Sequence, residues 1–511
     1  MVDHHRRDAL RRALAVASLA ALPGAASAMV RAPRELPDAW SQFERFDGLA
    51  LGRMVRHAEV HPRELLEALA TRVERLEPTL NAFSQLYWDL AEQQITVGVG
   101  SGPFAGVPYP IKDLGAHMAG RPTFSGSRLF ADHMAREDST LVERYRAAGL
   151  VLFGRSTTPE LGLTGTTESV AHGDTRNPWN IGLIAGGSSG GAGAAVGARM
   201  VPMAHATDGA GSIRTPASCC GVFGLKPSRG RVPIGPHRGE GWQGLSTGHA
   251  ITVSVRDSAA LLDISAGAEP GAMHVAPAPT RPWLAETHRA PGKLRIALAA
   301  TPPGGGPVHP TCTTAVMDAA RLCESLGHEI TETSLPVDAQ AMSDALLMLI
   351  AVETRKTLEN RAADLGRAPS ASDVEPVTWM FAEMAADFSA VDFSRVRDVF
   401  HRTTLAMARF MEDYDVVLSP TLALPPLPLG VINLSPPDLE RMIEQVMALG
   451  PFAALYNVTG QPSMSVPLYW TEDDIPIGSM FSARFGDEAT LFSLGAQLEQ
   501  ARSWHGRIPR P

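Results

Sequence analysis

Cysteine is scarce in this chain, which has four cysteines among 511 residues. Cys219 and Cys220 are adjacent, Cys312 and Cys323 lie eleven positions apart, and no C-x-x-C motif occurs. Four cysteines in a chain of this length exclude a disulfide framework, and their spacing gives no signal for a zinc ribbon, a haem-attachment site or a thioredoxin-like redox centre. The sequence therefore predicts no metal site.

The chain also lacks an excess of basic charge and, beyond its N-terminus, long apolar runs. Asp and Glu outnumber Lys and Arg by 54 to 45, so the basic excess of a nucleic-acid-binding protein is missing. No later stretch approaches the roughly 18 uninterrupted apolar residues that indicate a membrane-spanning helix. The chain is 44% hydrophobic, enough for a large core. We expect a small-molecule partner, no nucleic acid and no stable membrane insertion; the oligomeric state stays open, with a homodimer as one option.

Residues 1–28 have the layout of a secretory signal peptide. The three parts are a charged region, a short apolar run and a small-residue end, at residues 5–12, 13–22 and 26–28. The apolar run is about half as long as a membrane-spanning helix. Arg6 and Arg7, followed by Leu10, resemble a twin-arginine signal, although the general secretory route stays open. We expect cleavage near Ala28 and a periplasmic or secreted protein; the alternative is an amphipathic helical extension that stays attached.

Strand-like and helical patterns alternate along the rest of the chain. The strand-like segments are residues 150–154, 294–300, 416–418, 464–470 and 477–485, and the helical ones are 62–76, 309–326, 339–366, 393–413 and 487–501. Thr140 and Glu143 have the spacing of a capping box that opens another helix. This alternation predicts an α/β layered domain. No repeat and no polar linker divides residues 29–511, so we expect them to form one domain.

A glycine- and serine-rich segment at residues 186–191 admits three interpretations. Gly186-x-Ser188-x-Gly190 satisfies G-x-S-x-G, the nucleophile elbow of α/β-hydrolases. A phosphate-binding loop is the second interpretation, but no G-K-[ST] follows. The third is a tightly packed turn, since glycines on both sides of two serines permit strained backbone.

Two further segments carry candidate chemistry. In the first, Asp208 to Arg214, small residues precede Ser212 and leave backbone N–H groups unobstructed, so these could stabilise an oxyanion. Asp208 and Arg214 could pair to fix the loop; the alternative is a polar turn held by that ion pair. In the second, Lys112 lies in an apolar, proline-stiffened strand, where burial would lower its pKa and make a neutral base available. Taken alone, such a lysine is usually a surface residue whose charged end reaches solvent.

Together these segments resemble the amidase signature family. The shared order is Lys112, then Gly-Gly-Ser-Ser-Gly-Gly at 186–191, then Asp208-x-x-Gly211-Ser212-x-Arg214, with 24 positions from Ser188 to Ser212. Flanking runs agree, at residues 158–162, 177–180, 224–227, 457–462 and 476–478, and the likeness covers roughly residues 44–510. The resemblance implies the amidase signature fold, an α/β architecture with a large mixed β-sheet covered by helices on both faces.

The resemblance also implies a Ser–cisSer–Lys triad that hydrolyses a carboxylic amide C–N bond. Ser212 would be the nucleophile that becomes acylated, Ser188 would follow a cis peptide bond and relay the proton, and Lys112 would be the neutral base. The N–H groups of Gly209, Ala210, Gly211 and Ser212 would form the oxyanion hole. Gly187, Asp208 and Arg214 would support the site, and neither a metal nor an organic cofactor is needed.

The sequence departs from the family pattern at a few positions, but none removes a triad residue. Ala210 replaces a common glycine, and His205 stands where the family often has a small residue. The runs at 176–179 and 216–221 favour the bacterial general-amidase and cyclic-dimer-hydrolase group. The substrate stays open among aliphatic or aryl amides, amidated peptides and lactam-type oligomers such as the cyclic aminohexanoate dimer.

Three other functions remain as alternatives. A serine esterase of the α/β-hydrolase type would use Ser188, but it would leave Lys112 and Ser212 without a role. An amidotransferase-type subunit acting on aminoacyl-tRNA conflicts with an export signal, because its partners are cytosolic. An inactive exported binding protein conflicts with an intact triad.

Overall fold

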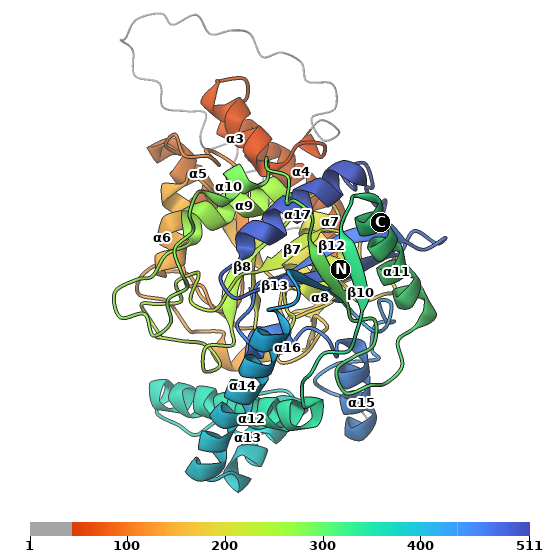
Figure 1. Cartoon of the computed structure of the whole chain (residues 1–511). Helices are drawn as coiled ribbons and strands as arrows, with labels where there is room; N and C mark the ends of the chain where they lie inside the picture. The colour runs from red at the N-terminus through yellow and green to blue at the C-terminus, as the bar shows by residue number, and fades with distance from the viewer. Residues whose placement is uncertain (1–42, 437) are drawn as a thin grey trace, which may run out of the picture.

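The computed structural model describes residues 43–436 and 438–511 (Figure 1). The expected signal peptide, residues 1–28, lies outside the described residues. Among the described helices, none is both long and apolar enough to cross a membrane.

An eight-stranded mixed sheet forms the centre of the molecule. Its strands, in spatial order, are β10 (Glu329–Glu332), β9 (Arg295–Leu298), β11 (Val416–Pro420), β13 (Pro476–Ala483), β12 (Ser463–Trp470), β7 (Phe223–Lys226), β8 (Thr247–Thr252) and β6 (Met203–Asp208). Strands β10, β9 and β11 are parallel, and all the other neighbours pair antiparallel. The expected α/β fold with a large mixed sheet is confirmed.

A three-stranded sheet lies beside β6 and carries the candidate base. It consists of β1 (Phe83–Leu86), β3 (Val151–Ser156) and β2 (Pro108–Lys112), in that order. Strand β2 runs parallel to β3 and packs beside β6 without a regular ladder between them. Lys112, the last residue of β2, donates its backbone N–H to Nδ1 of His205 on β6 at 3.2 Å. A two-stranded hairpin, β4 (Glu168–Ser169) and β5 (Gly173–Asp174), completes the strands.

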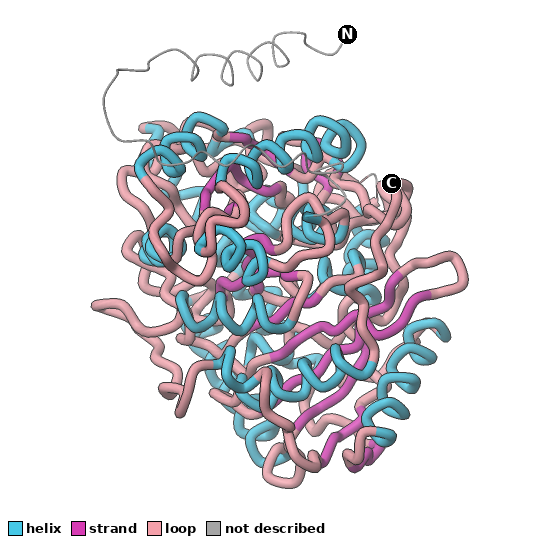
Figure 2. The backbone as a smooth tube through the Cα atoms, turned by 90° about the horizontal axis from the view of Figure 1, so that it is seen from above, coloured by secondary structure: helices cyan, strands magenta, loops and turns pink. Residues whose placement is uncertain are grey.

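Helices cover both faces of the large sheet, as Figure 2 shows from above. On β9, Ile296 and Leu298 join the core beneath α9 (Val255–Ser265), α11 (Pro310–Ser325) and α17 (Glu488–Ala501). Ala297, between them, joins the opposite core beneath α12 (Ala339–Leu365), α14 (Ala390–Phe410) and α16 (Leu455–Val458). This alternation is the period of two of a strand buried on both faces. Near β6 and β7 the second face is covered by α7 (Gly190–Gly197) and α8 (Arg214–Cys220).

The remaining helices lie around these layers. They are α3 (Gly48–Arg56), α4 (Pro62–Leu80), α5 (Trp88–Val97), α6 (Thr140–Ala147), α10 (Trp283–Glu286), α13 (Pro376–Met384) and α15 (Leu439–Leu449). Helices α4 and α5 pack on the three-stranded sheet. Helices α12, α13 and α14 gather at the end of the molecule opposite α3 and α4 (Figure 1).

Small residues let α7 and α8 approach each other behind the glycine-rich segment. Every residue of α7, whose sequence is GGAGAAVG, is buried. A Cβ on Gly193 would lie 2.9 Å from the Cβ of Pro216 on α8. Glycine lowers the stability of a helix by about 1 kcal/mol relative to alanine in its interior. The close packing that these glycines allow therefore explains their presence.

The expected capping box at Thr140 is wrong. The N-cap residue of α6 is Ser139, and its hydroxyl accepts the N–H of His117 at 2.8 Å instead of capping the helix. Thr140 donates its hydroxyl to Glu269 at 2.6 Å. Contacts with distant residues occupy both hydroxyls, and a local spacing rule cannot foresee such partners.

Candidate active site

Lys112 lies at the end of β2 and is fully buried. Its Nζ donates to Oγ of Ser188 at 2.7 Å and to Oγ1 of Thr207 at 3.0 Å. Strand β2 is buried along its whole length, because its apolar residues pack into the core. The lysine is therefore held in an apolar strand with its amine directed at two hydroxyls.

Burial makes Lys112 a candidate base at neutral pH. Desolvation lowers the pKa of its ammonium to about 7, and the charge of Asp208 opposes this shift. Among the described residues, no carboxylate forms an ion pair with Lys112. The neighbouring Asp113 instead accepts the N–H of Phe124 at 2.9 Å and lies 3.8 Å from Nε of Arg155. The carboxylate of Asp113 is thus used by Phe124 and Arg155 and forms no ion pair with the base.

The segment around Ser188 forms a tight turn against backbone. The peptide bond between Gly187 and Ser188 is cis, as the family resemblance implies. A Cβ on Gly187 would lie 2.1 Å from the carbonyl oxygen of Thr166, so only glycine fits there. Ser188 is 2% exposed, and its oxygen contacts the base.

Ser189 joins the two glycine-rich segments. Its hydroxyl donates to the carbonyl of Thr207 at 3.2 Å and accepts the N–H of the same residue at 3.3 Å. Its backbone N–H donates to the carbonyl of Ser212 at 3.3 Å. These contacts therefore bring the segment that holds Ser188 next to the segment that holds Ser212.

Ser212 lies in the loop between β6 and α8, which a buried ion pair holds in place. The carboxylate of Asp208 accepts the N–H groups of Gly211 and Ile213, at 2.8 and 3.0 Å. It also accepts hydrogen bonds from Nε and Nη2 of Arg214, at 3.0 and 2.9 Å. Although burial opposes its charge, the guanidinium of Arg214 holds the pKa of the Asp208 carboxyl far below its usual range.

Asn457 completes this network from a distant part of the chain. Its Nδ2 donates to the side chain of Asp208 at 2.9 Å, and its Oδ1 accepts Nη2 of Arg214 at 2.6 Å. Ser212 itself is half-buried, and its hydroxyl has no hydrogen-bond partner within the described chain. The loop is thus fixed while the hydroxyl at its tip stays free to react.

One of the four amides expected in the oxyanion hole is already used. The N–H of Gly211 donates to Asp208, so its hydrogen bond closes the loop instead of facing a substrate. The N–H groups of Gly209, Ala210 and Ser212 have no acceptor within residues 43–436 and 438–511. Asp208, which was predicted to pair with Arg214 and to support the site, captures this amide.

Sequence reasoning missed two residues that contact Lys112 directly. Thr207, just before the motif that begins at Asp208, accepts a hydrogen bond from the lysine amine. His205, noted as a departure from the family, accepts the backbone N–H of Lys112. Desolvation, helped by the charge of Lys112, lowers the pKa of His205 to about 3, so this ring stays neutral. In the sequence, the feature that could have pointed to both residues is their place on β6, one and three positions before Asp208.

Comparison with known proteins shows the family of this chain. Residues 64–492 match the family model described as Amidase. The chain belongs to the amidase family. It is therefore an enzyme that hydrolyses carboxylic amide C–N bonds, and the α/β-hydrolase esterase interpretation of Ser188 is set aside.

The amidase is similar along most of its length to characterised relatives. It is 36% identical over 477 residues to the 6-aminohexanoate-cyclic-dimer hydrolase of a Pseudomonas strain, covering 91% of this chain and 96% of the relative. A solved structure of 6-aminohexanoate cyclic dimer hydrolase matches with a TM-score of 0.85 and 34% identity, over 91% of this chain and 99% of that one. A bacterial aryl acylamidase of the amidase signature family matches with a TM-score of 0.82 and 26% identity, with coverage of 91% and 99%.

Proposed function

We propose that this amidase works by acyl transfer to Ser212, with Ser188 as proton relay and Lys112 as base. The contact that supports this proposal is the 2.7 Å distance between Nζ of Lys112 and Oγ of Ser188, inside a site where the lysine is fully buried. A neutral amine can accept the proton of Ser188, and Ser188 can in turn accept the proton of Ser212. This division gives each of the three residues one role.

In the first half-reaction, Oγ of Ser212 forms a bond to the carbonyl carbon of the amide. Its proton moves to Ser188, while the proton of Ser188 moves to Lys112. Negative charge develops on the carbonyl oxygen, and the amides of Gly209, Ala210 and Ser212, which have no acceptor within the described residues, would donate to it. The C–N bond then breaks, and the leaving amine receives a proton from Lys112 through Ser188. The product is an ester on Ser212.

In the second half-reaction, water takes the place of the amine. It loses a proton to the same relay as it attacks the ester carbonyl. The C–O bond to Ser212 breaks, Ser212 regains its proton, and the carboxylic acid leaves. Every proton moves between groups of the chain, the substrate and water.

For the substrate, we propose a neutral amide with an apolar chain, with the cyclic dimer of 6-aminohexanoate as the first candidate. Apolar side chains lie beside the three catalytic segments, next to polar ones such as Thr215. Leu114 lies beside Gly162, which also contacts Ser188. The indole of Trp242 lies beside Gly209, and Ala453 lies beside Gly211. The similarity to cyclic-dimer hydrolases supports the same choice.

A hydrolysis screen tests the proposed function. Purified enzyme is incubated with the cyclic dimer of 6-aminohexanoate, an anilide, a linear alkyl amide and an amidated peptide, and Ser212→Ala serves as the blank. We expect release of a primary amine from the cyclic dimer above the blank. Turnover of only the other amides would show that the cyclic dimer is not the substrate. No turnover of any amide above the blank would contradict the proposal.

We also propose that the enzyme is exported and that residues 1–28 are its signal peptide. The charged region, the apolar run and the Ala-Ser-Ala ending at Ala28 support this proposal. The paired arginines Arg6 and Arg7 favour the twin-arginine route. An exported amidase would meet its substrate outside the cytoplasm.

A further inference from the structure

The loop of residues 241–246 has an unusual backbone next to the nucleophile segment. Trp242 and Gln243 both have positive φ, at 50° and 52°. Within the described chain they are the only two adjacent non-glycine residues with this conformation. It costs about 1–2 kcal/mol for each such residue, and it persists only where the surrounding structure enforces it.

This backbone brings the indole of Trp242 against the Ser212 loop. A Cβ on Gly209 would lie 3.0 Å from Cε3 and 3.2 Å from Cζ3 of the indole. The six-membered ring therefore covers the residue whose N–H is a proposed oxyanion donor. Trp242 is half-buried and packs on the apolar core that contains Leu245, Phe452 and Ala453. One part of the indole thus supports the loop, and the rest stays accessible.

A buried carboxylate on a distant helix holds the loop in this conformation. Nε2 of Gln243 donates to Oε1 of Glu353 on α12 at 3.1 Å. Glu353 is 7% exposed, and it also accepts Nζ of Lys356 at 2.6 Å. Glu353 is therefore paired and oriented, with one oxygen shared between its own helix and the loop.

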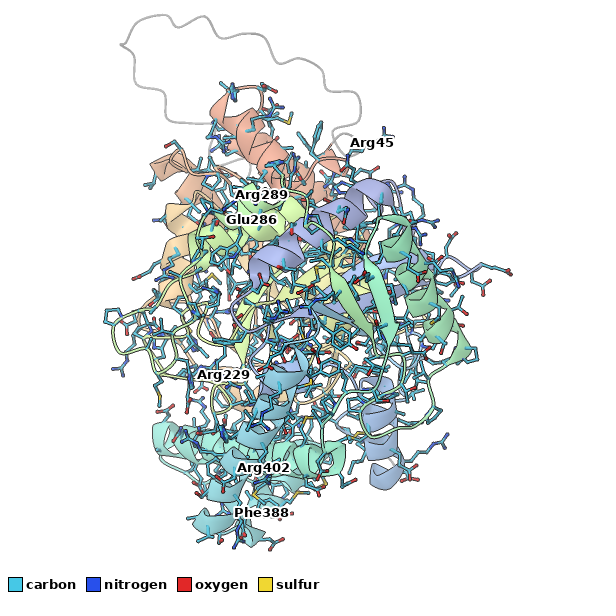
Figure 3. All side chains as sticks on the ribbon, in the orientation of Figure 1. Arg45, Arg229, Glu286, Arg289, Phe388 and Arg402 are labelled. Carbon is cyan, nitrogen blue, oxygen red and sulfur yellow. The ribbon has the colours of Figure 1, made fainter. Side chains whose placement is uncertain are left out.

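The loop is fixed at its other end as well. The N–H groups of Gly244 and Ser246 donate to the carbonyl of Gly241, both at 3.1 Å. Arg229 donates Nε to the carbonyl of Gly244 at 2.8 Å and Nη2 to the carbonyls of Asn457 and Val458 on α16. In Figure 3, Arg229 lies between the sheet and the α12–α14 helices. Two anchors therefore leave the indole little freedom to move away from Gly209.

We propose that Trp242 is a specificity-determining residue that contacts the apolar group next to the scissile carbonyl, and that Glu353 positions it through Gln243. The inference rests on the proposed role of Ser212 as nucleophile. The ring favours amides with a methylene chain or aryl group long enough to lie against it. Short amides cannot reach the indole and gain nothing from it.

Two homologous series of amides test this role. One series varies the acyl chain from acetyl to hexanoyl on a fixed aniline, and the other varies the alkyl amine on a fixed acyl group. Full contact gains about 0.8 kcal/mol for each methylene, which is about fourfold in kcat/KM. We expect this increase in the wild-type enzyme for one series. It should fall to less than twofold for each methylene in Trp242→Ala and lie between the two values in Trp242→Phe. An unchanged increase in Trp242→Ala would overturn the proposal.

Variants of α12 test the positioning role of Glu353. Glu353→Gln keeps an acceptor for Gln243 and should keep most of the chain-length increase. Glu353→Leu removes the acceptor and should reduce the increase, and combining it with Trp242→Ala should cause no further loss. The matched control is Glu359→Leu, on the same helix, where Glu359 pairs with Arg355 at the surface. Equal chain-length increases in Glu353→Leu and Glu359→Leu would overturn the role of Glu353.

A fluorophosphonate probe separates this inference from the proposed function. Folded variants should all be labelled at Ser212, with thermal unfolding recorded for each. If the wild-type enzyme is not labelled and hydrolyses no amide, the proposed function fails. If labelling persists and the chain-length increases do not differ, only the inference about Trp242 fails.

Discussion

At the residue scale, the decisive feature is a lysine whose surroundings favour its neutral form. Burial alone does not identify a base, because Lys226 is also fully buried and desolvation lowers its pKa to about 7 as well. The amine of Lys226, however, donates to the carbonyl of Pro227, which cannot supply a proton. Lys112 contacts hydroxyls. The partner of the amine, more than its pKa, separates a structural lysine from a catalytic one.

The pH dependence of the reaction follows from the pKa of Lys112. Only the neutral amine can accept a proton, so activity is lost as pH falls below the pKa and is retained above it. We expect kcat/KM to rise about tenfold per pH unit below pH 7 and to level off above the pKa of about 7. Stopped assays between pH 5 and 10 measure this profile. A rise centred near pH 10, where free lysine titrates, would contradict the neutral-base role.

Substitution of Lys112 separates a base from a fixed positive charge. Lys112→Ala should lower kcat/KM by about 10²–10⁴-fold, the usual contribution of a general base. Lys112→Arg should not restore activity, because guanidinium stays protonated. Near wild-type turnover in Lys112→Arg would show that only the charge matters.

The sequence identified the chemistry of single residues better than their hydrogen bonds. The apolar strand that ends in lysine raised the possibility of a buried Lys112, and the family resemblance gave that lysine its expected role as the base. The capture of the Gly211 amide by Asp208 was not foreseeable, because the path of a glycine-rich loop is set by contacts such as that with Asn457, more than 240 positions away. Local sequence does not encode such contacts.

At the scale of elements, the loop between β6 and α8 depends on one buried ion pair. Arg214→Met would leave the carboxylate of Asp208 buried without its cation, and losing one partner of a buried pair costs about 3–5 kcal/mol. We expect urea unfolding to show a loss of this size, together with loss of activity. The double variant Asp208→Asn with Arg214→Met should recover part of the stability. Equal stability of Arg214→Met and wild type would contradict the role of this pair.

Helix α7 gives a second prediction at this scale, through its glycines. Alanine should favour an isolated helix by about 1 kcal/mol over glycine. A Cβ on Gly191, however, would lie 2.4 Å from the carbonyl oxygen of Ala82, whereas one on Gly193 would meet the side chain of Pro216 at 2.9 Å. We expect Gly191→Ala to lower the melting temperature clearly more than Gly193→Ala. Stabilisation by Gly191→Ala would show that α7 is not packed as described.

Long elements were predictable from sequence, and short ones were not. The patterns at 339–366 and 393–413 correspond to α12 and α14, because long helices repeat their apolar positions many times. The periodic pattern revealed neither α7, which follows Ser188, nor α8, which follows Ser212. Both helices are short and fully buried, and α7 consists of small residues, so neither shows the exposed polar face that makes a helix visible in a sequence.

At the scale of the whole molecule, the fold brings three distant segments to one place. Strand β2 supplies the lysine, the turn before α7 supplies Ser188, and the loop after β6 supplies Ser212. Ser189 and Thr207 tie the last two together, and His205 ties β6 to β2. The family resemblance implied this convergence, whereas composition and periodicity indicated only an α/β protein.

Export is a prediction about the whole chain. N-terminal sequencing of the enzyme from its native host should find Met29 as the first residue, because cleavage is expected after Ala28. Replacing Arg6 and Arg7 by lysine should leave the enzyme uncleaved in the cytoplasm if the twin-arginine route is used. An intact N-terminus on the wild-type enzyme in the cytoplasm would contradict export.

The central claim is that Ser212, and not Ser188, becomes acylated. Its most direct test is to locate the adduct of a fluorophosphonate probe by mass spectrometry of peptides from wild type, Ser212→Ala and Ser188→Ala. The account predicts that wild type carries the adduct on Ser212, that Ser212→Ala carries none, and that Ser188→Ala reacts more slowly but at Ser212. An adduct on Ser188 in the wild-type enzyme would contradict the account.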